Sequence, residues 1–591
     1  MSPVPQARSL LSGNEAIARG AWEAGVTVAT GYPGTPSTEI LEFASRYKED
    51  IYCEWSPNEK VALEVAAGAS LSGARAIVTM KHVGLNVAAD PLMTLAYIGT
   101  VGGLVVCVAD DPGMHSSQNE QDTRHYARLG KMPILEPSDS EQARDFILLG
   151  MDISERYSTP VILRSTTRVS HSSGAVALGQ RAGREPVAGF AKDPTRFVPI
   201  PLYGRPMRVK LEERLGRMKA EVSSSPANAI EWGDRSVGII AEGIAYQYVR
   251  ELAPQASVLR IGWVWPFPDD LIREFAAGVE KVLVVEELDP ILEEHIRSLG
   301  IACEGKSAVP AIGELSPDRL APALGTQPRQ PSVADDEATK GLPARPPVLC
   351  PACPHRGIFY ALGKFDVVVT GDIGCYSLGV FPPLKRLDTI LCMGAGISMA
   401  HGMQKAGEKR KVVGIVGDST FFHSGITGLL DIAYNKGAAT IIVVDNRTTA
   451  MTGHQEHPGT GRTLLGEDTI SASIETFGRA CGFKNVATVD PYDIKPTVEA
   501  IRTAVESEEP WLIVARSPCP LYTKKNPGEP RRVDQELCKK CKLCLRLGCP
   551  AIEWVNDEIR VNELLCGGCA MCEKTCKEGA FQLASGACHE S

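Results

Sequence analysis

Aliphatic and β-branched segments alternate with helix-spaced segments along the first third of the chain. Residues 14–25 have helical spacing, and VTVATGYPGTP then predicts a buried strand that runs into a Gly/Pro turn. A helix is expected to resume at Thr38. The segments ARAIVTM, GLVVCVAD and PVILRS predict further buried strands. Strands that alternate with helices predict a parallel α/β domain, which we place at residues 1–195.

The same pattern recurs twice further along. A polar stretch predicts a connecting segment at residues 196–234, and SVGIIAEG, SVLRIGW and KVLVVEE predict a small α/β domain at 235–303. Residues 304–346 are rich in Pro, Ala and Asp, which is typical of a linker. The strands VVVTGDIG, KVVGIVGD and ATIIVVDN predict a second large α/β domain at 347–530, which leaves a cysteine-rich segment at 531–591.

Eight cysteines of this last segment form two runs with regular spacing. The runs are Cys538-x2-Cys541-x2-Cys544-x4-Cys549 and Cys566-x2-Cys569-x2-Cys572-x3-Cys576. Such runs are typical of a ferredoxin-like module with two [4Fe–4S] clusters, in which the fourth Cys of each run ligates the other cluster. We therefore group Cys538, Cys541, Cys544 and Cys576 on one cluster, and Cys566, Cys569, Cys572 and Cys549 on the other.

Two details of these runs depart from the usual pattern. Four residues precede Cys549, and Lys577 stands where a Pro usually follows the second run. Zinc ribbons and disulfides are the alternatives, but zinc sites usually show two separated CxxC pairs, and disulfides do not need the triple spacing. Cys588 lies outside both runs and is expected to be unligated.

Composition narrows the class of protein. With 591 residues the chain should hold roughly three to five domains. A net charge of −9 does not indicate the basic surface that binds nucleic acid or an anionic membrane. The first 20 residues lack the apolar region of a secretory signal, and no stretch approaches the length of a membrane span. We expect a cytoplasmic enzyme or electron carrier whose 18 cysteines serve thiolate chemistry.

A candidate site for a metal-bound diphosphate follows two predicted strands of the second large domain. Asp418 follows KVVGIVG, and Asn446 follows ATIIVVD. A Mg2+ ion that bridges two phosphates takes oxygen ligands, which the carboxylate and the amide would supply. Strand ends that lead into helices are natural phosphate sites. Taken alone, the pair is equally compatible with Asp and Asn in ordinary turns and caps.

These residues also resemble the thiamine-diphosphate motif GDG…NN, with Ser419 and Asp445 as departures, and the resemblance implies Thr448 as a further Mg2+ ligand. Upstream, CPACPHRG, GDIGCY and MGAGISMAHG resemble the CPGCGHG, GIGC and glycine-rich segments of 2-oxoacid:ferredoxin oxidoreductases. This resemblance implies a set of cofactor-binding residues: Cys353, His355, Gly374, Cys375, Gly394, Gly396, Gly417 and Ser419. Without it, Cys350 and Cys353 would be half of a zinc or redox site, and His355 an ordinary loop histidine.

The N-terminal domain resembles the pyrimidine-binding domain of the same oxidoreductases. Its GYPGTPSTE segment is similar to their YPITPS, and Glu59 matches their aminopyrimidine-contacting glutamate. A carboxylate hydrogen-bonded to N1′ of the pyrimidine favours the imino tautomer, whose 4′ nitrogen can take the C2 proton. Glu54 and Glu64 are the neighbouring alternatives, but the register with Gly68 favours Glu59.

Further residues are candidates on the substrate side by resemblance, and Lys81 is among them as the neighbour of His82 in a loop expected to face the cofactor. We expect His82 and His454 to be catalytic, and Thr35, Arg124 and His457 to bind substrate. Each histidine has a capping or packing role as its alternative. Arg124 could pair with a 2-oxoacid carboxylate through two hydrogen bonds, or be a plain surface arginine.

The order of the parts resembles the alpha subunits of indolepyruvate:ferredoxin oxidoreductases over nearly the whole chain. This resemblance implies oxidative decarboxylation of arylpyruvates to acyl-CoA and CO2, with thiamine diphosphate, Mg2+ and two [4Fe–4S] clusters, in aromatic amino-acid catabolism. It also implies an external ferredoxin, an alpha dimer, and a beta subunit with a gamma-type domain, as α2β2. The alternatives are a sister enzyme for pyruvate, 2-oxoglutarate or branched-chain 2-oxoacids, and a non-catalytic electron-transfer subunit.

Overall fold

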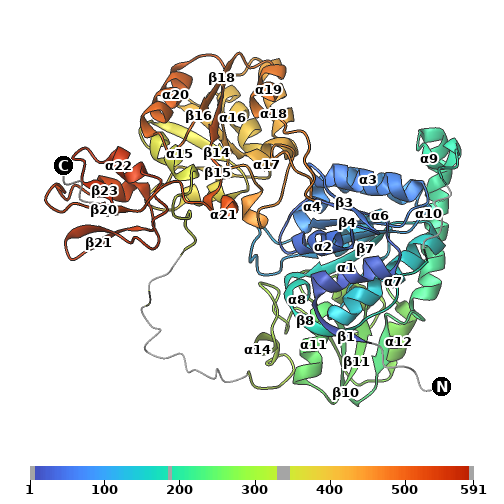
Figure 1. Ribbon diagram of the computed structural model, residues 1–591. Helices are drawn as coiled ribbons and strands as arrows, with labels where there is room; N and C mark the ends of the chain where they lie inside the picture. Colours follow the sequence, from blue (N-terminus) through green and yellow to red (C-terminus); the bar gives the residue numbers. More distant parts are fainter. Residues whose placement is uncertain (1–6, 184–188, 329–341, 343–345, 585–591) are drawn as a thin grey trace. The chain divides into compact units, whose positions relative to one another are not determined.

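The structure is a computed structural model that describes residues 7–183, 189–328, 342 and 346–584. The chain divides into two compact units, residues 1–340 and 341–591, and each is described here by itself (Figure 1). Cys588 lies outside the described residues. No helix among the described residues is long and apolar enough to cross a membrane.

The first unit is built on a seven-stranded sheet with the order β12-β6-β7-β5-β4-β2-β3. All neighbours are parallel except β12, which runs antiparallel to β6. Its strands are β2 (Val28–Gly31), β3 (Tyr52–Trp55), β4 (Ala76–Lys81), β5 (Leu104–Asp110), β6 (Ile134–Leu135), β7 (Val161–Thr166) and β12 (Trp263–Trp265). The central strands β4 and β5 are buried throughout, as in parallel sheets covered on both faces.

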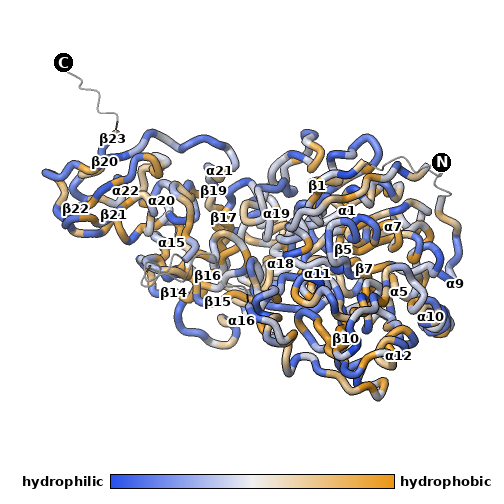
Figure 2. Tube along the Cα trace, turned by 90° about the horizontal axis from the view of Figure 1, so that it is seen from below, coloured by the Kyte–Doolittle hydropathy of each residue, from blue (hydrophilic) through white to orange (hydrophobic). Residues whose placement is uncertain are grey.

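Helices connect the strands of this sheet, and a separate two-stranded sheet lies beside them in the order of elements. The helices are α1 (Gly13–Glu23), α2 (Thr38–Ala44), α3 (Glu59–Leu71), α4 (His82–Val87), α5 (Ala89–Ile98), α6 (Arg124–Gly130), α7 (Ser140–Tyr157) and α8 (Thr167–His171). β1 (Arg8–Ser12) pairs antiparallel with β8 (Ser173–Ala177). The connecting segment then forms α9 (Pro194–Phe197) and α10 (Pro201–Val222), and α10 is largely hydrophilic (Figure 2).

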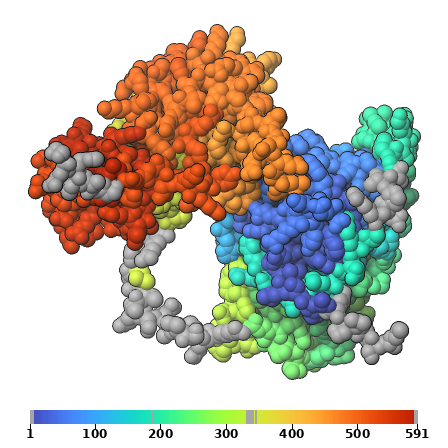
Figure 3. Space-filling model, viewed as in Figure 1, coloured from blue at the N-terminus to red at the C-terminus, as the bar shows by residue number. Residues whose placement is uncertain are grey.

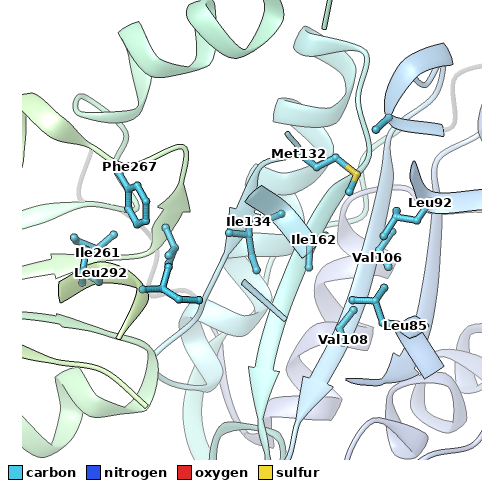
Figure 4. Packing of buried hydrophobic residues seen from close by; sticks show 14 of the residues in the cluster. Leu85, Leu92, Val106, Val108, Met132, Ile134, Ile162, Ile261, Phe267 and Leu292 are labelled. Atoms are coloured by element: carbon cyan, nitrogen blue, oxygen red, sulfur yellow. The ribbon is translucent and has the colours of Figure 1, made fainter. Parts of the chain in front are cut away.

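A four-stranded sheet with the order β13-β10-β11-β9 completes the first unit. Its elements are β9 (Ala229–Glu231), β10 (Asp234–Glu242), β11 (Ala256–Ile261), β13 (Val282–Val285), α11 (Gly243–Leu252), α12 (Asp269–Ala277) and α13 (Ile291–Ser298). One hydrophobic cluster spans both sheets of the unit: Ile134 and Ile162 of the large sheet share it with Ile261, Phe267 and Leu292 (Figure 4).

The packed part of the first unit continues beyond residue 303, where the sequence predicts a linker. α14 (Pro317–Leu320) contacts α11, and Val309, Leu315 and Leu320 are buried against the four-stranded sheet. The reason is local burial: three apolar side chains in a Pro-rich stretch suffice to dock it onto an existing sheet face.

The second unit contains a six-stranded, all-parallel sheet with the order β15-β14-β16-β17-β19-β18. Its strands are β14 (Val367–Gly371), β15 (Thr389–Ile390), β16 (Lys411–Gly417), β17 (Thr440–Asp445), β18 (Asn485–Val489) and β19 (Trp511–Arg516). Its helices are α15 (His355–Leu362), α16 (Ala395–Lys405), α17 (Asp418–Thr420), α18 (Ile426–Tyr434), α19 (Ile474–Ala480), α20 (Ile494–Glu506) and α21 (Pro520–Thr523). The predicted parallel α/β architecture is therefore confirmed in both units.

A small C-terminal module packs on this α/β domain within the second unit (Figure 3). It consists of β20 (Arg531–Val533) paired with β23 (Phe581–Leu583), the hairpin β21 (Ile552–Val555) and β22 (Glu558–Val561), and α22 (Met571–Thr575). Tyr492 and Ile494 of the α/β domain share a hydrophobic cluster with Leu547 and Met571 of the module. The module is therefore docked by apolar packing.

Candidate active site

Three oxygen-bearing groups converge where β16 and β17 end. Asp418 and Asn446 are buried, and the side-chain amide of Asn446 lies 3.3 Å from a carboxylate oxygen of Asp418 and 2.8 Å from the carbonyl oxygen of Thr448. Without a cation the amide nitrogen donates to both oxygens, whereas the opposite orientation turns the amide oxygen toward them. With Mg2+, a carboxylate, an amide and a carbonyl oxygen are the donors this metal takes. The predicted ligands thus fit the metal in kind and in place.

His457 orients the metal-ligand candidate Asp418. The backbone N–H of Gly459 donates to Nδ1 of His457 at 3.1 Å, so Nε2 carries the proton toward Asp418 Oδ2, also at 3.1 Å. Burial alone would raise the pKa of Asp418, but His457 and further hydrogen bonds hold that pKa below its ordinary value. Both ring nitrogens of His457 are engaged, which favours an orienting role over the predicted substrate-binding one.

The two departures from the thiamine motif have local partners. Asp445 accepts a hydrogen bond from Nε of Arg516 at 2.6 Å, and Ser419 accepts one from the hydroxyl of Thr449 at 2.9 Å. Burial and then the charge of neighbouring Asp418 raise the pKa of Asp445, and Arg516 opposes that shift.

Glycines of the cofactor-binding set allow close packing behind the metal-ligand candidates. An added Cβ at Gly374 or Gly417 would lie 2.3 or 2.8 Å from the ring of Tyr376. Gly394 has a φ of +85°, and Gly396 lies against the backbone carbonyl of residue 415. These positions therefore require glycine for packing and conformation.

His355 and Cys375 lie near Asp418, and further cysteines lie near Cys375. Burial lowers the pKa of His355 to about 4, with the charge of Asp418 opposing it, so this ring is neutral at pH 7. Burial raises the pKa of the Cys353 thiol to about 12 and that of Cys375 to about 11, with Cys350 adding to both and Cys519 adding to the second. The sequence reasoning missed Cys519, because it sought a second CxxC pair rather than single cysteines from other loops.

In the first unit, Glu59 is the buried glutamate among the three alternatives. It begins α3, and an added Cβ at Gly84 would lie 2.5 Å from its Oε1. Glu64 pairs with exposed Lys60, and Glu54 accepts hydrogen bonds from the hydroxyls of Tyr52 and Ser56. Burial at a helix start supports the choice of Glu59 as the carboxylate that meets the pyrimidine.

Lys81, His82 and the loop of Thr35 lie together at the ends of β2 and β4. The ammonium group of Lys81 donates to the carbonyl of Ser116 at 2.8 Å, and the Ser116 hydroxyl donates to the carbonyl of Thr35 at 3.3 Å. Burial lowers the pKa of Lys81 to about 8. His82 Nε2 lies 3.2 Å from the carbonyl oxygen of Asn119, and burial lowers its pKa. The structure thus brings one buried cation to the predicted substrate side.

The structure does not support the predicted substrate-binding role of Arg124, because its side chain is buried and paired internally. Its side chain is 1% exposed and donates to Asp122, Glu242 and Glu286, and to the carbonyl of Asp289 at 2.8 Å. The two glutamates belong to the four-stranded sheet and its following loop. Arg124 therefore joins the two sheets of the first unit, and no donor remains for a substrate carboxylate.

His454 lies in the loop after β17 and does not contact the metal-ligand candidates through any described hydrogen bond. It has a φ of +71°, and its ring centroid lies 6.0 Å from that of Tyr522. Its Nδ1 is buried without a hydrogen-bond partner, and burial lowers its pKa. Its catalytic assignment stays a prediction.

The eight cysteines of the C-terminal module fall into two neighbourhoods. One cavity is lined by Cys549, Cys566, Cys569 and Cys572. Burial raises the pKa of the Cys544 thiol to about 11, with neighbouring Cys541, Cys538 and Cys576 adding to the shift. All eight are free thiols, and among the described residues no three potential metal ligands stand at metal-binding spacing. The two neighbourhoods agree with the two predicted groups of four, and thiols in fours are the donor set that two [4Fe–4S] clusters would take.

Two family models of known proteins match the two large α/β domains of the chain. Residues 19–211 match the family model "Pyruvate flavodoxin/ferredoxin oxidoreductase, thiamine diP-bdg", and residues 372–515 match "Thiamine pyrophosphate enzyme, C-terminal TPP binding domain". Together with the fold, these matches define a thiamine-diphosphate-binding 2-oxoacid:ferredoxin oxidoreductase.

Full-length relatives narrow this class to one family. The chain is 42% identical to the indolepyruvate oxidoreductase subunit IorA of Pyrococcus horikoshii, over 98% of this chain and 97% of the relative. It is 43% identical to the subunit of the same name from Methanothermobacter thermautotrophicus, over 97% of each. The chain therefore belongs to the indolepyruvate oxidoreductase IorA subunit family. It is also 24% identical to the 2-oxoglutarate synthase subunit KorA of Methanothermobacter thermautotrophicus, over 47% of this chain and 86% of that one.

Proposed function

We propose that this subunit oxidatively decarboxylates arylpyruvates, such as indolepyruvate and phenylpyruvate, to acyl-CoA and CO2 and passes the electrons to ferredoxin, in aromatic amino-acid catabolism. The observation that carries the substrate class is the full-length identity to subunits named for indolepyruvate. The 2-oxoglutarate relative is more distant and aligns with only part of the chain. The expected partner is a beta subunit with a gamma-type domain, in an α2β2 assembly.

The chain's own residues divide the work around the cofactor. Asp418, Asn446 and Thr448 would hold the Mg2+ of thiamine diphosphate, and His457 keeps the Asp418 carboxylate turned toward it. Glu59 would accept a hydrogen bond from the pyrimidine and so place a proton-accepting nitrogen at the reacting carbon. Thiamine diphosphate supplies an electron sink for loss of CO2 when bound.

The substrate carboxylate needs a cation, and Lys81 is the buried one on that side. The amine lies beside Ser116 and the loop of Thr35, where a carboxylate could take a charge-assisted hydrogen bond. The nearby His82 is neutral at pH 7, because burial lowers its pKa. This assigns to Lys81 the role that the sequence reasoning gave to Arg124, with Thr35 beside it.

Electrons leave through thiolate-bound iron in this proposal. Oxidative decarboxylation releases two electrons, and each [4Fe–4S] cluster accepts one at a time. The Cys375 thiol interacts with the charge of Asp418 and with Cys350 and Cys519, and thiolates are soft ligands of the kind that iron takes. Coenzyme A would then take the acyl group as a thioester.

Anaerobic reduction of methyl viologen tests this function. The chain, purified with its co-expressed beta subunit and coenzyme A, should turn over indolepyruvate and phenylpyruvate faster than pyruvate or 2-oxoglutarate. Glu59→Gln should abolish turnover with iron and sulfide contents unchanged. Preference for pyruvate or 2-oxoglutarate would assign the chain the substrate specificity of a related oxidoreductase. Full turnover by Glu59→Gln would refute the proposed contact of Glu59 with the pyrimidine.

A further inference from the structure

The C-terminal module has one end that is covered by the α/β domain of the same unit. Buried Arg356, at the start of α15, donates from one nitrogen to the carbonyls of Leu547 (2.8 Å) and Gly548, and from the other to the carbonyl of Cys350 (3.0 Å). A guanidinium can join two loops in this way because its donors form a rigid fork. The loop that precedes Cys549 is thereby fixed to the domain.

The second loop of the same cysteine group is covered as well. An added Cβ at Gly567, between Cys566 and Cys569, would lie 2.7 Å from the Cβ of Ala352. The hydroxyl of Tyr492 donates to the carbonyl of Ala352 at 2.6 Å. The cavity lined by these cysteines also has Ala352 and Arg356 on its wall. A protein partner therefore cannot approach this cysteine group from the side of the α/β domain.

The other cysteine group lies on an open and basic face. Cys541 is the one exposed cysteine of the eight, whereas the other seven are buried or half-buried. Residues 537–546 carry four basic side chains and no acidic one, in a chain of net charge −9. Lys539, Lys540 and Lys542 are all exposed around Cys541.

The acidic groups near this face leave its charge positive. Lys540 lies 3.4 Å from Asp557, but both side chains are exposed, so the pair is well solvated. The ammonium group of Lys542 lies 3.9 Å from the centre of the Trp554 ring. The ring is uncharged, so this contact leaves the positive charge of Lys542 in place. Asp534 and Glu536 precede the run in sequence, and the Asp534 carboxylate accepts hydrogen bonds from the backbone N–H groups of Glu536 and Leu537.

We propose that Lys539, Lys540 and Lys542 around Cys541 form the docking face for an acidic one-electron carrier protein. Electrons then leave the chain from the cluster on Cys538, Cys541, Cys544 and Cys576. A basic face steers an acidic partner and suits a weak, transient redox encounter. This inference rests on the proposed clusters, and it adds which end of the module is the exit.

The electron balance of the exit step is simple. One electron passes from the reduced cluster to one oxidised carrier, so the cluster is oxidised as the carrier is reduced. The two electrons from one substrate therefore reduce two carriers in succession. Each carrier must leave before the next can bind, which a charge-steered weak interface allows.

The test compares two electron acceptors on the complete enzyme with its partner subunit. The triple variant Lys539→Glu, Lys540→Glu, Lys542→Glu should raise the KM for an acidic ferredoxin by about tenfold or more, because steering changes association by factors of about 10 to 1000. Its rate with methyl viologen, a small dication, should be unchanged. Raising the ionic strength should slow ferredoxin reduction by the wild type and have little effect on the variant.

The matched control is Lys409→Glu, Lys436→Glu, Lys484→Glu, which makes the same charge change with exposed lysines of the α/β domain. If the control raises the KM as much, or the test variant leaves it unchanged, the docking face is refuted. Should the test variant lose iron, the neutral Lys539→Gln, Lys540→Gln, Lys542→Gln variant replaces it, with a smaller expected rise. Absence of viologen reduction by the wild type would instead refute the proposed function.

Discussion

Two buried charge clusters in this protein look alike chemically and differ in purpose. One lies at the ends of β16 and β17 around Asp418, and the other joins the two sheets of the first unit around Arg124. Both contain carboxyl groups with shifted pKa values. In the Arg124 cluster every guanidinium nitrogen has acceptors, whereas among the described ion pairs Asp418 is joined by a histidine and by no arginine or lysine. Oxygen-bearing groups that converge beside such a carboxylate, rather than a shifted pKa, mark the candidate cation site.

The largest effect on function should follow from Asp418→Asn. Loss of the carboxylate should weaken Mg2+-dependent thiamine diphosphate binding by more than about 100-fold, because even residues that only orient metal ligands cost about 10 to 100-fold. Thermal stability without cofactor should stay equal or rise, since the charge next to Asp445 disappears. Calorimetric titration and thermal unfolding check both. A clear loss of stability would assign Asp418 a structural role.

The largest effect on stability should follow from Arg124→Leu. The change leaves Asp122, Glu242 and Glu286 buried without their cation, and removal of one partner from such a cluster costs about 3–5 kcal/mol. Hydrogen exchange at β6 and β12 should report the loosened joint between the sheets. Thiamine binding by folded protein should persist. Selective loss of substrate affinity with normal exchange rates would restore the substrate-binding assignment.

His457→Gln should produce an intermediate effect on the metal. Without Nε2–H facing Asp418 Oδ2, the carboxylate loses its orientation, and Mg2+ affinity should fall by about 10 to 100-fold. A raised Mg2+ requirement, with the KM for the 2-oxoacid unchanged at saturating metal, distinguishes orientation from substrate contact. If only the KM for the 2-oxoacid rises, the predicted substrate-binding role of His457 is supported instead.

The smallest effect concerns pH. Burial raises the pKa of Glu287 from 4.5 to about 7, opposed by the N–H of Leu315, with Arg164, Glu136 and Glu314 as the nearby charges. The folded state holds this proton after the unfolded state has lost it, so the contribution of Glu287 to stability falls as pH rises from about 4.5 to 7. Glu287→Gln should flatten this slope by up to about 1.4 kcal/mol per pH unit. Parallel pH profiles of unfolding for both proteins would contradict the shift.

The alternation of strands and helices, the cysteine spacing and the positions of Asp418 and Asn446 were readable from the sequence, because each depends on neighbours within one strand-turn-helix unit. The roles of Arg124 and His457 were not, because their partners come from distant parts of the chain: Glu286 is 162 residues from Arg124, and Asp418 is 39 from His457. Cys519 is likewise far from Cys375 in sequence, and the fold brings the two thiols close enough to interact. The sequence by itself determined which chemistry is present. The tertiary structure decided which charged side chains are engaged in internal ion pairs and which remain available to ligands. The reason is that burial and pairing with residues distant in sequence set the charge and the partners of each group.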